Sequence, residues 1–161
     1  MTDDSRALLR HTLATLAYRA AKPLRDAPDA FGSFRASETT RTPVQVLAHM
    51  GDLLDWALTL VAGAERWHNA ELLPWTDETA RFFAALARLD QALALASAAG
   101  APEATLFKLF QGPIADAFTH VGQLTMLRRQ FGAPIRAENY YRADIETGRI
   151  GPTQTAPRRE F

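Results

Sequence analysis

Four histidines and no cysteine are the first chemical feature of this 161-residue chain. The histidines are His11, His49, His68 and His120. Without cysteine the chain has no disulfide, no thiolate metal ligand and no cysteine nucleophile. Any metal site or acid–base chemistry therefore relies on imidazole and carboxylate groups.

One pair of these groups has the spacing of metal ligands. Asp116 and His120 are four residues apart in a segment with helical period, so their side chains lie one turn apart and can reach a common point. A third ligand from a neighbouring helix completes a metal site of the kind found in helical bundles, and His49 is the candidate for it. This set of two imidazoles and one carboxylate leaves coordination positions open, and it suits zinc, nickel, iron or manganese.

The same residues also have ordinary structural interpretations. A single Asp and His at this spacing more often form a hydrogen bond or a solvated pair than a metal site. We interpret His11 and His68 as surface or capping residues.

Three further residues are candidates for the surroundings of the metal. Asp52 could orient His49, Trp56 could wall the pocket, and Gln123 could hydrogen-bond a ligand or the substrate. Asp52 and Gln123 also have surface-polar interpretations.

The elements that must position these residues are helices. Apolar side chains three and four residues apart predict helices over about residues 5–21, 42–67, 76–99 and 113–131. Thr42 is a natural N-cap and Pro43 suits the first helical position. No stretch alternates with a period of two, so no sheet is expected. We therefore predict an all-α protein: a four-helix bundle with a long first connection.

The domain organisation follows from the same segments. The length is typical of a single domain, which we assign to residues 1–161. The bundle covers about residues 5–131, and an irregular C-terminal tail covers residues 132–161. Within that tail the segment ENYYRADI, residues 138–145, could fold over one end of the bundle and bring Asn139, Tyr140 or Tyr141 near the pocket.

Charge and hydropathy exclude several classes of protein. The 18 basic and 18 acidic residues leave no excess of positive charge, which argues against a nucleic-acid partner. No apolar run approaches the roughly 20 residues of a membrane span. The first residues, MTDDSRALLR, lack the apolar core of a secretory signal, so a cytoplasmic location is expected.

The segments LAHMGDLLDW, residues 47–56, and DAFTHVGQLTMLRR, residues 116–129, resemble the DinB/YfiT-like superfamily of four-helix-bundle metalloenzymes. That family has one histidine near the start of its second helix and two in an H-x-x-x-H-x-x-Q-like pattern on the last bundle helix. His49 matches the first position, and His120 with Gln123 matches the end of the pattern. Asp116 stands where the family has its other histidine.

The resemblance implies a divalent-metal-dependent enzyme, with zinc or nickel as the usual metal. Characterised members are thiol-dependent S-transferases or isomerases, which implies a low-molecular-weight thiol cosubstrate and a small-molecule substrate. Hydrolysis by an activated water is equally consistent with a chain that has no cysteine. The alternative is a non-catalytic bundle, a stress-related protein that binds a small apolar ligand or forms a homodimer.

Overall fold

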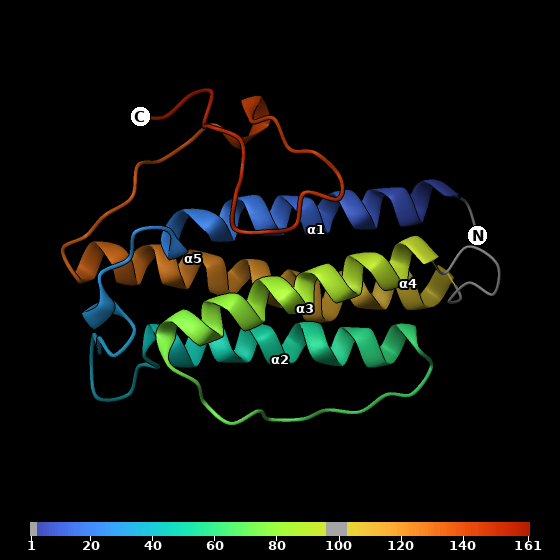
Figure 1. The fold of residues 1–161 in the computed structure, drawn as a ribbon, viewed down its shortest axis with the longest axis horizontal. Coiled ribbons are helices and arrows are strands. Elements are labelled where there is room, and N and C mark those ends of the chain that lie inside the picture. The colour runs from blue at the N-terminus through green and yellow to red at the C-terminus, as the bar shows by residue number, and fades with distance from the viewer. Residues whose placement is uncertain (1–2, 96–102) are drawn as a thin grey trace.

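The computed structural model describes residues 3–95 and 103–161 and is built from helices (Figure 1). The first three long helices are α1 (Asp3–Leu24), α2 (Pro43–Val61) and α3 (Trp75–Leu95). The last long helical segment is continuous and consists of α4 (Glu103–Leu109), the π-helical turn η2 (Phe110–Ile114) and α5 (Ala115–Gln130). Two short 3₁₀ turns, η1 (Asp29–Phe31) and η3 (Tyr140–Arg142), complete the elements. The described residues contain no strand, only an isolated bridge between Glu138 and Glu160, so the prediction of an all-α protein is confirmed.

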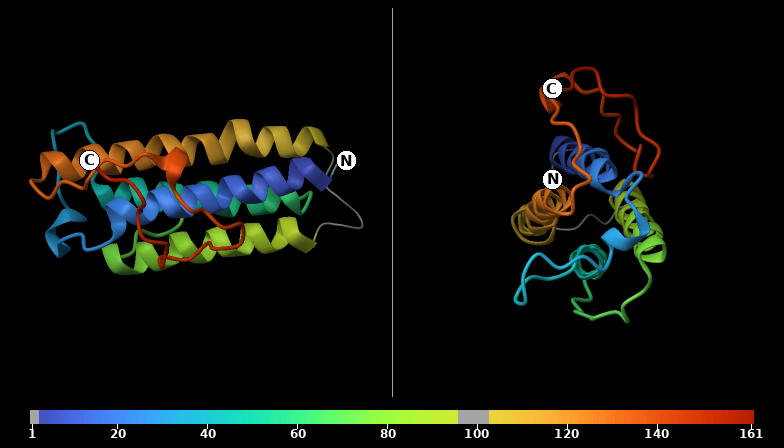
Figure 2. Two further views of the ribbon diagram at one scale, coloured as in Figure 1. Left: turned by 90° about the horizontal axis from the view of Figure 1, so that it is seen from above. Right: turned by 90° about the vertical axis from the view of Figure 1, so that its left-hand side faces the viewer.

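The long helices lie side by side, and each packs on two neighbours. α2 packs against α3 and α5, and α1 packs against the same two helices from the other side. Viewed along their axes, α1 and α2 therefore lie diagonally opposite (Figure 2). Among residues 3–95 and 103–161, no helix is long and apolar enough to cross a membrane.

The core lies between these helices and consists of the apolar residues that the helical period predicts. Leu13, Leu47, Leu54, Leu86 and Leu124 are completely buried, with at least one from each long helical segment. Burying a leucine side chain contributes about 1.5–3 kcal/mol, so this shared layer is the main force that holds the helices together.

The N-terminus of α2 forms as the sequence predicts. Thr42 is the N-cap: its hydroxyl accepts a hydrogen bond from the backbone N–H of Gln45 at 3.4 Å. The Gln45 side chain accepts one in return from the Thr42 N–H at 2.9 Å, and Pro43 follows the cap. This reciprocal capping box fixes the start of α2 two turns before His49.

Two helix ends differ from the predictions. α2 ends at Val61 rather than near Trp67, because Gly63 adopts a left-handed conformation (φ 70°) that ends the helix. α1 continues through Pro23 to Leu24 and is followed by Asp26 in a left-handed conformation (φ 51°). A proline in the last turn removes only one hydrogen bond, so it does not end the helix. The predicted end of the third helix, at Gly100, lies outside the described residues.

The last helical segment begins earlier than predicted. Pro113 does not start a helix but lies inside the π-helical turn between α4 and α5. Proline has no N–H, and its ring clashes with the carbonyl group four residues earlier in a regular α-helix. The wider π-turn accommodates it and continues the helix directly into Asp116.

The C-terminal tail packs along α1 (Figure 2). Tyr18 donates a hydrogen bond of 2.6 Å to Glu138, and Lys22 forms ion pairs with Glu138 at 2.7 Å and Glu160 at 2.8 Å. Tyr140 stacks beneath the guanidinium group of Arg19, 4.3 Å from its ring centre. These contacts hold the tail on the helix diagonally opposite α2.

Candidate metal site

His49, Asp116 and His120 meet where α2 packs against α5, and we call them the His–Asp–His cluster. Asp116 lies between the two imidazoles, with one carboxylate oxygen 3.6 Å from His49 Nε2 and the other 3.4 Å from His120 Nε2. One ligand atom from each residue can be chosen so that all three lie within 4.8 Å of one another. In the part of the chain that the structure describes, this is the one group of three or more His, Asp or Glu side chains arranged in this way.

The two carboxylate–imidazole distances are close to those between donors that share a metal ion. Two donors at about 2.1 Å from zinc, at the tetrahedral angle, are about 3.4 Å apart. A direct hydrogen bond between a carboxylate and an imidazolium is shorter, about 2.7–2.9 Å. Each carboxylate oxygen of Asp116 thus lies farther from its imidazole than in a strong hydrogen bond, at a spacing that a pair of metal ligands also has.

The three side chains of the cluster are buried to different extents, and Asp116 is the most exposed of them. The His120 side chain retains 10% of its exposure, His49 retains 24%, and Asp116 retains 45%. An ion held here is enclosed by the two helices on the imidazole side and is accessible to a small molecule on the carboxylate side.

Gln123 sets the tautomer of His120. Its amide oxygen is 2.8 Å from His120 Nδ1, which therefore carries the hydrogen and donates it. In the neutral ring the lone pair is then on Nε2, the atom that faces Asp116. A hydrogen bond of this kind to the second ring nitrogen is typical of metal-binding histidines, because it holds the ring in the ligating orientation.

The charge state of His49 also favours metal binding. Burial lowers its pKa below the ordinary value, and the neighbouring His120 and Arg41 lower the pKa further, while Asp116 opposes them. A lowered pKa keeps the imidazole neutral at pH 7, and the neutral form is the one that ligates a metal.

Trp67 packs against His49. The ring centres of Trp67 and His49 are 5.9 Å apart, and Trp56 packs edge-on against Trp67 at 5.8 Å. Trp56, which the sequence predicts to line the pocket, therefore packs against Trp67, and Trp67 in turn packs against His49. Sequence reasoning missed Trp67 because it extended the second helix to this residue, whereas the chain leaves α2 at Val61 and returns along it.

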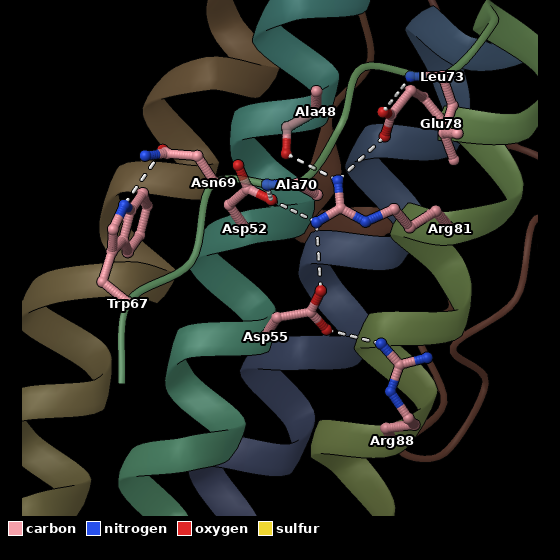
Figure 3. Close-up of polar contacts among 10 residues, drawn as sticks. All are labelled: Ala48, Asp52, Asp55, Trp67, Asn69, Ala70, Leu73, Glu78, Arg81 and Arg88. Atoms are coloured by element: carbon pink, nitrogen blue, oxygen red, sulfur yellow. Dashed lines mark hydrogen bonds and ion pairs between the residues drawn. The ribbon is translucent and has the colours of Figure 1, made fainter. Parts of the chain in front are cut away.

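Asp52 does not face His49, so the expectation that it orients that ring is wrong. Its carboxylate instead forms a close ion pair with Arg81 of α3 and accepts a hydrogen bond from the Ala70 N–H at 3.4 Å (Figure 3). Three residues on a helix turn the side chain by about 300°, so His49 and Asp52 point about 60° apart around α2. Asp52 is on the side that packs against α3, which supplies an oppositely charged partner.

The Arg81 network anchors the segment that carries Trp67. Arg81 contacts Asp52, Asp55 at 3.2 Å and Glu78 at 3.3 Å, all three of them carboxylates (Figure 3). Glu78, which is completely buried, also accepts a hydrogen bond of 3.0 Å from the Leu73 N–H. The segment between α2 and α3 thus donates two backbone hydrogen bonds, one to Asp52 and one to Glu78, and Arg81 pairs with both carboxylates.

The other residues singled out from the sequence lie elsewhere or have local roles. His11 is at the surface, 3.3 Å from the Thr147 hydroxyl, and His68 lies in the exposed segment after α2. The expectation that the tail approaches the pocket is wrong for Tyr140, which packs on Tyr18 and Arg19 of α1. Tyr141 is almost fully exposed.

A hollow of about 410 Å³ adjoins the cluster at His120, and neither Asp116 nor His49 lines it. His120 and Gln123 form one side of it, and Arg41, just before α2, contributes the cationic group. The sequence offered no signal for Arg41, because this residue lies in an irregular connection whose path is set by packing.

Comparisons with protein-family models, with curated proteins and with solved structures find no match to this chain.

Proposed function

We propose that this protein is a four-helix-bundle metalloprotein that binds a divalent ion through His49, Asp116 and His120. The observation that carries the proposal is the position of Asp116, 3.4–3.6 Å from the Nε2 atoms of two histidines on different helices. The hydrogen bond between Gln123 and His120 supports it independently, because it directs a lone pair of His120 into the cluster.

Three protein donors leave at least one coordination position for an outside ligand. A divalent ion bound there would act as a Lewis acid and lower the pKa of a water or thiol in that position. The residues of the chain have separate tasks: His49, Asp116 and His120 would hold the ion, and Trp67 packs against the His49 ring. The hollow beside His120 and the exposed carboxylate of Asp116 leave an approach for a small-molecule substrate.

Zinc and nickel are the metals that we propose first, with iron or manganese as alternatives, because two imidazoles and one carboxylate suit all four. The resemblance to the DinB/YfiT-like superfamily supports a transferase or isomerase that uses a low-molecular-weight thiol. A hydrolase that activates water is the second form of the same proposal.

Metal titration tests the proposal directly. Protein without a polyhistidine tag is stripped with a chelator and titrated with Zn²⁺ and Ni²⁺ by calorimetry. We expect one site per chain in the wild type and its loss in His49→Ala and His120→Ala. His11→Ala is the matched control, because this exposed histidine lies outside the cluster and should leave the titration unchanged.

Asp116→Asn tests the carboxylate separately. The amide keeps the shape of the side chain and removes its charge, so we expect a clear loss of affinity without a loss of folding. Equal, weak binding by the wild type and the histidine variants would contradict the metalloprotein proposal and favour a bundle that binds a small apolar ligand or dimerises.

A further inference from the structure

The hollow beside the His–Asp–His cluster combines one cation with apolar walls. Arg41 supplies the charge, Val46 of α2 and Met126 and Leu127 of α5 supply apolar surface, and His120 forms the boundary with the cluster. None of the residues that line this hollow is acidic. It therefore offers a positive group at one place and an apolar surface beside it.

Arg41 is exposed, and its charge has no internal partner in the part of the chain that the structure describes. Within residues 3–95 and 103–161, no ion pair or side-chain hydrogen bond involves its guanidinium group. Nearby Arg35, by contrast, has a partner in the same connection, because it donates a hydrogen bond of 2.6 Å to the Thr40 carbonyl group. The charge of Arg41 is close enough to the cluster to lower the pKa of His49.

The surroundings of Arg41 favour an anion with a single charge. A phosphate group is usually bound by several donors, such as free N–H groups at a helix N-terminus. At the start of α2 these groups are unavailable, because Pro43 has no N–H and Thr42 caps the N–H of Gln45. One planar guanidinium group matches one carboxylate, which it can bind through two parallel hydrogen bonds.

We propose that the substrate of the site is a small carboxylate with an apolar body. Its carboxylate binds Arg41, its apolar part lies against Val46, Met126 and Leu127, and its other end reaches the edge of the cluster at His120. The assignment as substrate rests on the proposed metal function, whereas the binding of the carboxylate to the hollow does not. A volume of about 410 Å³ accommodates such a small ligand.

The net charge of the site with a metal ion bound also favours a carboxylate as the substrate. A divalent ion and Arg41 together outweigh the single negative charge of Asp116. An anion is therefore attracted to the site, and a cation is repelled from it.

The test compares the binding of hexanoate and its neutral analogue hexanamide, measured by NMR titration, in wild type, Arg41→Met and Arg136→Met. The first series uses chelator-treated protein, so that the probe cannot bind a metal. Arg136 is the matched control, because it is a highly exposed arginine on the tail. We expect Arg41→Met to weaken hexanoate binding about tenfold, as for loss of a charge-assisted hydrogen bond, with hexanamide binding and the Arg136 variant unchanged.

A second variant tests the apolar wall. Met126→Gln should weaken hexanoate binding more than acetate binding, because only the longer chain reaches this residue. Equal affinity of wild type and Arg41→Met for hexanoate would overturn the proposal, as would equal loss of hexanoate and hexanamide.

Zinc titration of the same proteins separates this inference from the metal function. Zinc binding together with hexanoate binding that does not depend on Arg41 overturns only the substrate class. Hexanoate binding that depends on Arg41, in a protein that does not bind zinc, overturns the metal function and leaves a carboxylate-binding pocket.

Discussion

Replacing Arg81 with Met should cost about 3 kcal/mol of stability, the lower part of the range of about 3–5 kcal/mol for removing one partner of a buried ion pair. The substitution leaves the carboxylate groups of Glu78 and Asp52 without their cation. Glu78 has no exposed surface and Asp52 retains 7%, so neither can be solvated in place of the lost partner. We choose the lower part because Arg81 itself retains 15% exposure.

Arg88→Met is the matched control for this prediction. Arg88 lies on the same helix and contacts Asp55 at 2.6 Å, but half of its side chain is exposed. Exposed ion pairs of this kind contribute about 0–1 kcal/mol. Urea unfolding of the two variants, followed by far-UV circular dichroism, should therefore differ by at least about 2 kcal/mol on the values given above.

Two more variants test whether buried carboxylates cause the large loss of stability in Arg81→Met. Arg81→Lys keeps the charge but loses the planar group that reaches three carboxylates, so its loss should be intermediate. Adding Glu78→Gln to Arg81→Met should recover part of the stability, because it removes one buried charge. Similar small losses for Arg81→Met and Arg88→Met would refute the argument that burial makes this network strong.

Three further predictions concern the cluster and the tail. Gln123→Leu should lower zinc affinity about 10–100-fold in calorimetric titration, because it removes the hydrogen bond that orients His120, and an unchanged affinity would contradict that role. Without metal, the wild type should lose stability as the pH falls from about 7.5 to about 5.5, because the lowered pKa of His49 means that the unfolded chain binds the proton more readily; His49→Asn should show a shallower slope in urea unfolding at the two pH values. Tyr18→Phe should cost about 1.5–3 kcal/mol in thermal or urea unfolding, because it removes a hydrogen bond to a charged, buried Glu138, and a loss below about 0.5 kcal/mol would count against the tail as part of the stable structure.

The features that could be predicted from the sequence are those with local causes. The capping box at Thr42 depends on residues within one turn, and the apolar period places Leu47 and Leu54 in the core. The approach of Asp116 and His120 depends only on their spacing along one helix. His49 is a weaker inference from sequence, yet it lies beside them because α2 and α5 are neighbours in the fold.

The features that the sequence did not indicate depend on contacts between distant segments. Pro113 has the same appearance in a sequence whether it starts a helix or lies in a π-turn, and packing on both sides decides between them. Trp67 reaches His49 because the segment after α2 turns back, and Arg81 holds that segment from another helix. Proximity in sequence links Asp52 to His49, while the actual partner of Asp52 is 29 residues away.

A crystal structure of the protein soaked with Zn²⁺, with anomalous data collected above and below the zinc edge, shows whether the His–Asp–His cluster binds the metal. We predict one strong anomalous peak per chain between α2 and α5, about 2.0–2.2 Å from Nε2 of His49, Nε2 of His120 and a carboxylate oxygen of Asp116. No peak at this position, or a peak only at the surface beside His11 or His68, would contradict metal binding by the cluster.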